Sequence, residues 1–395
     1  TKRVKQGLPD LREIPSCIGG DPKKRTGIVV AKSIPAKKYG VQTGEPVGLA
    51  LQKCPDLVCV PSDFALYDRC SKAFKSICAS YAPVMESFSI DEVFLDMTGT
   101  GQIYPDPIAT ACEIKDRIYR ELGFTVNVGI STNKLLAKMA SDFEKPNKVH
   151  TLYPEEVPQK MWPLPVRDLL FLGKASEKKL IQNGIHTIGD LAQANEKEIQ
   201  MLLGEKSGHQ LYLSANGIDD SPVKAQRDEA KGISVETTFD EDIVSYEQIF
   251  PILLSQCDIV AARMRREGKK CNCVAVSFRT LEFKNKSHQR KLENPTDVTD
   301  EIYQNVKRLF QESWSGQPLR LIGVALTGLT EDSFVQMSLF EDPKKREQQK
   351  KLDEAMDNIR KKFGNDKISR ASTMNVSGRI ARKAKAQMEN GREKK

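Results

Sequence analysis

Long apolar runs, paired cysteine motifs and histidine clusters are all missing from this chain of 395 residues. No apolar run approaches the roughly 20 residues that a membrane-spanning helix needs, so the sequence predicts no membrane protein. No charged and then apolar leader with a cleavage site is visible, and we expect a cytoplasmic protein. The 9 cysteines are irregularly spaced without a CxxC pair, and the 4 histidines stand apart. This pattern indicates reduced core thiols rather than a zinc site or a disulfide framework.

Acidic residues are scarce in two parts of the chain. Residues 341–395 carry 17 Lys and Arg against 9 Asp and Glu, a surplus of 8 that equals the net charge of +8 for the whole chain. Residues 263–291 carry 10 basic and 2 acidic residues. One such run alone would indicate a solvated helix face, but two runs favour a polyanionic partner, and we expect nucleic acid.

The chain is too long for one ordinary core, and its patterns predict an α+β multidomain protein. Residues 1–155 alternate short apolar strands with helices, residues 156–222 are helical throughout, and residues 223–231 form a polar linker. Residues 232–330 have the order β-α-β-β-α-β, which builds one antiparallel-sheet domain. Residues 331–395 form a tail with a charged helix and a basic end.

Two adjacent acids stand in an apolar stretch, SIDEVFLD at residues 89–96. This stretch predicts a strand over about 87–97, on which Asp91 and Glu92 would point to opposite faces unless the strand ends or bulges there. A buried carboxylate needs a partner, and divalent cations favour carboxylate oxygens. The spacing leaves two interpretations open: a metal site, or acids that cap the end of a strand through backbone amides.

Several segments, in order along the chain, resemble the Y-family (translesion) DNA polymerases of the bacterial DNA polymerase IV-like group. They are the fingers-like GIVVAKSIPAKKYGVQTGEP, the acidic SIDEVFLD, the palm-like VGISTNKLLAKMASDFEKPN, the thumb-like helix-hairpin-helix FLGKASEKKLIQNGIHTIGDLA and the little-finger-like region 231–329. The resemblance implies a right-hand polymerase with fingers at 1–62, palm at 63–155, thumb at 156–222 and a β-α-β-β-α-β little finger at 232–330. It also implies a monomer that adds dNTPs to primer-template DNA with low fidelity.

The resemblance assigns the two acids to catalysis. Asp91 and Glu92 would bind metal in a site with two Mg²⁺ ions, with Glu92 beside the primer 3′-hydroxyl. Asp96 would be structural. Ser89 would either contribute through its backbone or its hydroxyl, or be a plain strand residue. The family takes a third carboxylate and a ribonucleotide-excluding aromatic from an N-terminal strand, which we expect to be missing from this chain. The missing strand leaves open a second interpretation, a non-catalytic, clamp-tethered DNA-binding protein. The hairpin leaves open a third, a helix-hairpin-helix repair enzyme such as a lyase.

Two lysines would contact the nucleotide triphosphate, by the same resemblance. They are Lys37 in SIPAKK and Lys145 in KPNK. This sequence departs from the family pattern nearby, because Ile34 stands where the family has a Tyr and Lys37 where it has an Arg. Ile34 cannot donate a hydrogen bond, and a lysine offers a point charge instead of the two-pronged contact of a guanidinium.

DNA contacts are expected from the thumb and the little finger. Gly173 and Gly184 of the thumb hairpin would let backbone amides approach a phosphate, although Phe171 stands where the family has its first Gly. The basic stretch would present one face of two adjacent strands and their hairpin to DNA phosphates, through Arg279, Lys284, Lys286 and Arg290.

The tail contains QMSLF at residues 336–340, which resembles a bacterial sliding-clamp peptide. Gln336, Leu339 and Phe340 would be its anchors, since an exposed apolar pair in a polar setting is a common docking element. The other interpretation is a linker that happens to contain apolar residues.

Overall fold

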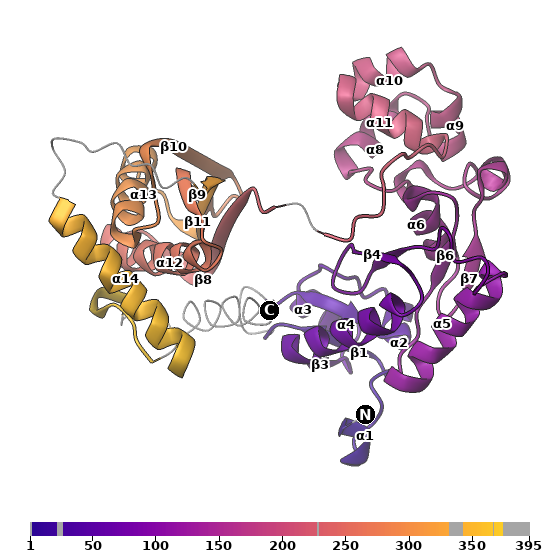
Figure 1. Ribbon diagram of the computed structural model, residues 1–395, viewed down its shortest axis with the longest axis horizontal. Helices are drawn as coiled ribbons and strands as arrows, with labels where there is room; N and C mark the ends of the chain where they lie inside the picture. The colour runs from indigo at the N-terminus through magenta and orange to yellow at the C-terminus, as the bar shows by residue number, and fades with distance from the viewer. Residues whose placement is uncertain (1, 22–26, 227–228, 332–342, 366, 374–395) are drawn as a thin grey trace. The chain divides into compact units, whose positions relative to one another are not determined.

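The computed structural model describes residues 2–21, 27–226, 229–331, 343–365 and 367–373 (Figure 1). The chain forms two compact units, one made of Thr1–Ser62 with Glu229–Lys395 and the other of Asp63–Asp228. Among the described residues, no helix has both the length and the apolar composition to cross a membrane.

The N-terminal part of the chain holds a three-stranded sheet and short helices. The strand order is β2-β1-β3, with β1 antiparallel to β2 and parallel to β3. The elements are α1 at Lys2–Lys5, β1 at Ser16–Gly19, β2 at Val29–Lys32, α2 at Ile34–Lys38, α3 at Val47–Lys53 and β3 at Val58–Val60. Ser33 starts α2, because its hydroxyl accepts from the Ala36 amide and donates to the Ile14 carbonyl. Buried Val29 and Val47 anchor a small core.

Residues 63–155 alternate helices with short strands, as predicted. The elements are α4 at Phe64–Ala79, β4 at Val84–Ser87, β5 at Val93–Asp96, α5 at Pro107–Leu122, β6 at Val128–Ile130, α6 at Lys134–Asp142 and β7 at Val149–Thr151. The strands pair as antiparallel β4-β5 and parallel β6-β7. One prediction here is wrong, because the strand expected over 87–97 is interrupted: residues 88–92 form the bend that joins β4 to β5. Polar backbone and side-chain contacts within the bend replace strand pairing there.

Gly129 of β6 fixes how closely α6 packs on this strand. A Cβ at position 129 would lie 1.9 Å from the carbonyl oxygen of Ala137, so no larger residue fits between strand and helix. The other end of the contact is set by Asn133, whose side chain accepts a hydrogen bond from the Leu136 amide at 2.8 Å and begins the helix. Helix α6 is therefore rigidly seated, with Leu136 and Ala140 fully buried.

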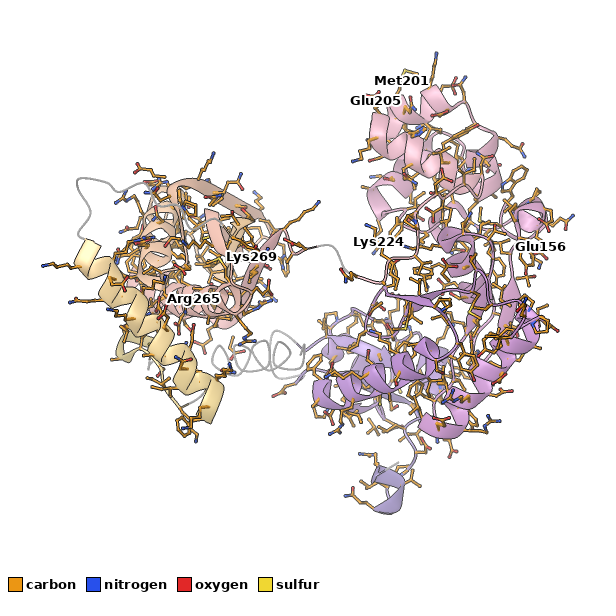
Figure 2. The ribbon with its side chains drawn as sticks, in the orientation of Figure 1. Glu156, Met201, Glu205, Lys224, Arg265 and Lys269 are labelled. Atoms are coloured by element: carbon orange, nitrogen blue, oxygen red, sulfur yellow. The ribbon has the colours of Figure 1, made fainter. Side chains whose placement is uncertain are left out.

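The region after residue 153 is helical, as predicted. It contains η1 at Pro154–Glu156, α7 at Val157–Lys160, η2 at Val166–Asp168, α8 at Lys174–Gln182, α9 at Ile188–Gln193, α10 at Glu196–Leu203 and α11 at Glu205–Ala215. Thr187 caps α9 as the sequence pattern indicates, and Asp190 completes the capping box. Leu135, Leu136 and Met139 of α6 share one apolar core with these helices. The chain then returns to α6 and β4, where the Leu135 amide donates to Asp219. The amide of Lys224, a residue labelled in Figure 2, donates to Glu86.

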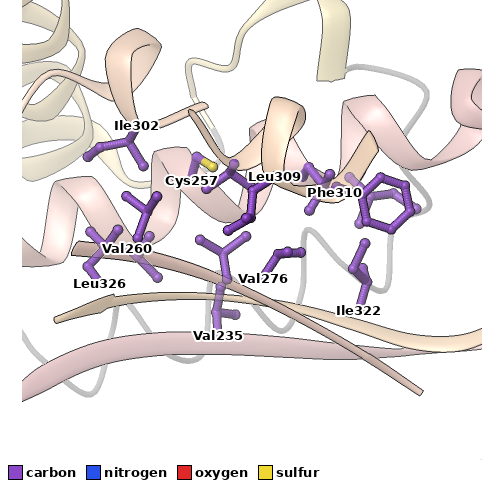
Figure 3. Close-up of a cluster of buried hydrophobic side chains, with 14 of the residues drawn as sticks. Val235, Cys257, Val260, Val276, Ile302, Leu309, Phe310, Ile322 and Leu326 are labelled. Atoms are coloured by element: carbon purple, nitrogen blue, oxygen red, sulfur yellow. The ribbon is translucent and has the colours of Figure 1, made fainter. Parts of the chain in front are cut away.

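Residues 232–330 form a four-stranded antiparallel sheet with order β10-β9-β11-β8 and two helices on one face (Figure 1). The elements are β8 at Gly232–Ile243, α12 at Tyr246–Arg266, β9 at Lys270–Thr280, β10 at Asn285–Thr296, α13 at Thr299–Ser313 and β11 at Leu319–Thr330. The predicted β-α-β-β-α-β order is confirmed. Figure 3 shows the core between the two layers, where Val260 and Ile302 of the helices face Val276 and Ile322 of the sheet. Burial of such a continuous apolar layer is what stabilises this domain.

A further helix, α14 at Pro343–Phe363, packs on this domain through buried ion pairs, and η3 at Ala371–Thr373 follows it. Arg265 of α12, labelled in Figure 2, lies 2.8 Å from Asp357 and 3.3 Å from Asp353. Arg360 lies 2.6 Å from Asp258. Burial pushes the pKa of Arg265 down, but its hydrogen bond to Asp357 and the negative charges of the surrounding aspartates together outweigh this and leave the pKa raised. The helix is thus attached mainly by charge pairing, and Met356 is the one buried apolar side chain among its described residues.

Candidate functional site

The two adjacent acids lie together on the bend between β4 and β5, which we call the acid loop (residues 88–92). Ser89 Oγ is 2.8 Å from Asp91 Oδ1 and 3.1 Å from Glu92 Oε2. The amides of Phe88 and Ser89 both point to the Glu92 carbonyl, at 3.1 and 3.2 Å. Because the strand ends before the acids, the two carboxylates meet at one hydroxyl instead of pointing to opposite faces. Ser89 is therefore not a plain strand residue, and its hydroxyl lies within hydrogen-bonding distance of both acids.

Helix α4 holds the acid loop from behind. Lys75 Nζ donates to the Ser89 carbonyl at 2.7 Å, and Ser71 Oγ donates to the Ile90 carbonyl. These two side chains are one turn apart on α4, so they reach successive carbonyls of the loop. The sequence analysis did not find either residue, because a serine and a lysine at this spacing also fit any partly exposed helix face.

Ion pairs connect Glu92 of the acid loop to side chains on and just after helix α6. Lys138 Nζ lies 2.8 Å from Glu92 Oε1 and 2.7 Å from Asp142 Oδ2, and Lys145 Nζ lies 2.6 Å from Asp142 Oδ1. We call Glu92, Lys138, Asp142 and Lys145 the ionic chain. Burial pushes the pKa of Lys138 down, but hydrogen bonds to Asp142 and Glu92 outweigh it and leave the pKa raised. Burial likewise pushes the pKa of Asp142 up, and its hydrogen bonds to Lys138 and Lys145 bring it below its usual value.

The acid loop fits a divalent cation as a partial ligand set. Asp91 and Glu92 supply carboxylate oxygens, the donors that Mg²⁺ prefers, and Mg²⁺ in phosphate-processing sites is commonly held by one or two carboxylates plus substrate phosphates. Within the part of the chain that the structure describes, no group of three His, Cys, Asp or Glu residues converges on one point. Asp96 does not join them, since its carboxylate accepts from the Thr98 amide at 2.9 Å, which agrees with a structural role.

The second predicted phosphate lysine, Lys37, is exposed on α2. Ile34, at the start of the same helix, is 64% exposed, so it presents an apolar surface at the position where the resemblance implies a hydroxyl. Both residues belong to the unit that does not contain the acid loop, and the role of Lys37 stays a prediction.

The predicted DNA-contacting hairpin of the helical region consists of α8, α9 and the turns on either side of α8. Gly173 is the N-cap of α8, with an ordinary φ of −84°, and Gly184, beyond its C-terminal end, has a φ of 79° that favours glycine. Phe171 also has a positive φ, 66°, and its side chain is exposed. Phe171, at the position where the resemblance implies a glycine, thus has a left-handed backbone without being glycine.

The pairing register corrects the basic face expected on the four-stranded sheet. Directly paired residues of neighbouring strands point to the same side. Arg279 pairs with Asn285, whereas Lys286 pairs with buried Phe278 and Arg290 with buried Val274. Lys286 and Arg290 therefore point to the helix-covered side, opposite to Arg279, and Arg290 forms an ion pair with Glu312 of α13 at 2.5 Å. The prediction that these residues share one face is wrong.

The open face of the sheet instead carries small side chains beside two basic ones. Arg279 and Lys291 flank positions occupied by Ser277 and Ala275 on β9 and by Gly323 on β11. Lys284, in the hairpin between β9 and β10, is exposed. Sequence reasoning missed Lys291, because β10 is exposed along most of its length and its alternation does not show which side faces the helices.

The predicted clamp peptide, with Gln336, Leu339 and Phe340, lies outside the described residues.

Three family models match the chain in the expected order. The impB/mucB/samB family model matches residues 2–142, a DNA polymerase-iota thumb-domain model matches residues 167–219, and the C-terminal domain model of the impB/mucB/samB family matches residues 230–339. The chain is also 44% identical to DNA polymerase IV of Clostridium acetobutylicum over 362 residues, which cover 92% of this chain and 91% of the relative. The chain belongs to the Y-family of DNA polymerases.

Other members of the Y-family agree with this placement. DNA polymerase IV 2 of Bacillus subtilis is 36% identical over 384 residues, 95% of this chain and 92% of the relative. Among solved structures, a Y-family DNA polymerase chimera matches with a TM-score of 0.70 at 23% identity, covering 81% of this chain and 92% of the other. The resemblance found in the sequence is confirmed, and so is the α+β multidomain fold with palm, thumb and little finger. The family implies DNA and dNTP substrates and dependence on a divalent metal.

Proposed function

We propose that this Y-family member is a template-directed translesion DNA polymerase that adds dNTPs to a primer end with low fidelity at the acid loop. One observation carries the proposal: Asp91 and Glu92 converge on Ser89 in an exposed bend that two helices hold in place. Such a loop positions two carboxylates without burying them, which suits residues that must receive a metal and a substrate phosphate.

In this proposal the metal ligands are Asp91 and Glu92, which would hold two Mg²⁺ ions. When bound, the ions supply charge neutralisation and activation of the primer 3′-hydroxyl. Ser89 orients the two carboxylates, since its hydroxyl lies within hydrogen-bonding distance of both. Lys145 would neutralise triphosphate oxygens, and its own contact with Asp142 keeps it next to α6 until a phosphate arrives. Lys37 would supply a second positive charge to the triphosphate.

DNA binding in this proposal uses the phosphate backbone and carries no sequence preference. The left-handed Gly184 and the N-cap Gly173 of the hairpin would offer backbone amides to a phosphate. The open face of the sheet would add Arg279, Lys284 and Lys291. Lys286 and Arg290 would at most contribute from the strand edge, since their side chains point to the helix-covered side.

The tail would tether the enzyme to the bacterial sliding clamp through Gln336, Leu339 and Phe340. Burying two large apolar side chains contributes about 1.5–3 kcal/mol each. Ordering the peptide offsets part of this gain, so micromolar affinity at best is expected. A weak tether of this kind suits a polymerase that exchanges with others at the clamp.

Primer extension tests the proposed activity against the non-catalytic alternative. A labelled primer-template, dNTPs and Mg²⁺ should give template-directed extension by the purified protein, and chelation of the metal should stop it while DNA binding continues. A non-catalytic, clamp-tethered DNA-binding protein would bind the same DNA without lengthening the primer under any metal condition. No observation on the described residues favours that alternative.

A further inference from the structure

We propose that Lys138 is a positioning residue that couples the two ends of the active site, the acid loop and the phosphate lysine Lys145. The proposal rests on the proposed polymerase function and adds a residue to it. Lys138 binds Glu92 on one side and Asp142 on the other, and Asp142 in turn binds Lys145. The four side chains alternate in charge along the ionic chain, so each one fixes its neighbour.

Burial shows that Lys138 is the centre of this arrangement. Its side chain is 14% exposed, whereas those of Glu92, Asp142 and Lys145 are 38%, 43% and 59% exposed. An exposed lysine loses side-chain entropy when it is held in one geometry, and such pairs contribute little. Lys138 has already lost most of its freedom by packing, so its ammonium group is presented to both carboxylates in a fixed place.

The backbone beneath Lys138 is fixed as well. Ala137, the residue before it, has its carbonyl oxygen against Gly129 of β6, where no side chain fits. Met139 and Ala140, the residues after it, are buried. Because 3.6 residues make one turn, positions 138 and 142 lie on one side of α6. The rigid edge of α6 thus carries Lys138 and Asp142, and Lys145 follows three residues after the helix ends.

The fourth charge of the ionic chain, Glu92, lies in the acid loop. The ionic chain therefore connects helix α6 to one of the proposed metal ligands. The Lys138 ammonium group pairs with Glu92 Oε1, while the Ser89 hydroxyl donates to Glu92 Oε2. These contacts define where the carboxylate lies before substrate arrives. Removing the ammonium group would leave Glu92 and Asp142 as two nearby negative charges without the cation between them. The Glu92 carboxylate would no longer be held in one position. The Asp142 carboxylate would also move, and Lys145, which pairs with it, would lose its fixed orientation.

The test compares Lys138→Met with Lys115→Met. Lys115 is a matched control, because its side chain on α5 is 12% exposed and its partner is Asp116, outside the ionic chain. Steady-state single-nucleotide extension gives kcat and KM. A primer ending in a dideoxynucleotide gives the dissociation constant of dNTP without chemistry, and fluorescence anisotropy gives that of primer-template DNA.

Lys138→Met should lower kcat by about 10- to 100-fold, the usual effect of losing a residue that orients a metal ligand. It should also weaken dNTP binding to the dideoxy-terminated complex several-fold, while DNA affinity and the unfolding temperature match those of Lys115→Met. Lys138→Arg should recover most of kcat, since a guanidinium can bind both carboxylates. Asp142→Asn should weaken dNTP binding more than it lowers kcat, because it acts on Lys145 first.

Two outcomes would overturn the coupling. One is a Lys138→Met protein that keeps kcat and dNTP affinity like the Lys115→Met control, and the other is a loss of activity that only follows a loss of stability. If Lys138→Met does not fold, the other two variants decide. A folded Lys138→Arg protein with as little activity as a protein without the ammonium group, or a folded Asp142→Asn protein that keeps the wild-type affinity for dNTP, contradicts the proposal. If the wild-type protein fails to extend any primer, the proposed polymerase function itself is contradicted. That result is distinct from a failure of the coupling through Lys138.

Discussion

The ring of Phe171, in the turn before α8, contacts the ring of Phe88, at the start of the acid loop, with centroids 6.4 Å apart in an edge-to-face arrangement. Phe88 also contacts Phe94 of β5 with centroids 5.3 Å apart. The helical hairpin and the acid loop are therefore in direct contact through aromatic side chains. Phe171 makes this contact from a left-handed backbone, at φ 66°, with 78% of its surface exposed.

Phe171→Gly should be more stable than Phe171→Ala. Both remove the ring, but only glycine relieves the left-handed conformation, which costs an L-residue roughly 1–2 kcal/mol. The free energy of unfolding should therefore be about 1 kcal/mol higher for the glycine variant, as measured by urea denaturation followed by circular dichroism. Equal stability of the two variants would mean that residue 171 does not hold a left-handed backbone in solution.

Asp91→Asn and Glu92→Gln should each remove primer extension by at least about 10³-fold, since each deletes a charged metal ligand while keeping the side-chain shape. Primer-template affinity, measured by anisotropy, should stay within a few-fold of wild type. Asp116→Asn on the exposed face of α5 is the control and should extend normally. Near-normal extension by either acid-loop variant would remove these residues from the catalytic site.

Arg279→Ala should weaken DNA binding more than Arg290→Ala. Arg279 lies on the open face of the sheet, whereas Arg290 is engaged with Glu312 on the other side. Loss of one phosphate contact should reduce the slope of log affinity against log salt by about 1, without any dependence on DNA sequence. Titrations at several salt concentrations measure both effects. If Arg290→Ala changes the slope as much as Arg279→Ala does, DNA also reaches the strand edge.

Replacing Leu339 and Phe340 with Ala should remove binding to the bacterial sliding clamp and the stimulation of synthesis by the clamp. The physical reason is the loss of both apolar anchors of a weak peptide contact. Extension without the clamp should be unchanged. Ser338→Ala, inside the same peptide, is the control and should keep clamp stimulation. Persistent stimulation of the double variant would place the tether elsewhere in the protein.

The sequence predicted the fold better than it predicted the site. The strand β8 was predictable because Ile233, Val235 and Phe239 alternate with polar residues, which shows directly which side meets the helices. The strand β10 has no such signal, since it is an edge strand and exposed on both sides, and only its pairing with β9 reveals where Arg290 points.

The acid loop shows a second limit of sequence reasoning. The apolar residues of SIDEVFLD continue the strand pattern through the acids, while the hydrogen bonds that end the strand come from Lys75 and Ser71 on a helix earlier in the chain. Lys138 and Asp142 have the spacing of an ordinary helical ion pair. Lys138 also pairs with Glu92, which tertiary packing brings close to α6 and which no local sequence pattern indicates.

Helix α14 differs from the rest of its domain because its detachment would expose little apolar surface. Of its described residues, Met356 is the only buried apolar one, and its other buried side chains are Asp353 and Arg360. The dependence of an opening reaction on denaturant follows the surface that is newly exposed. Release of α14 should therefore respond weakly to urea, and its amide hydrogens should exchange through this shallow local opening. The amides of β9 and β11, which lie over the apolar core, should exchange only when the whole domain unfolds.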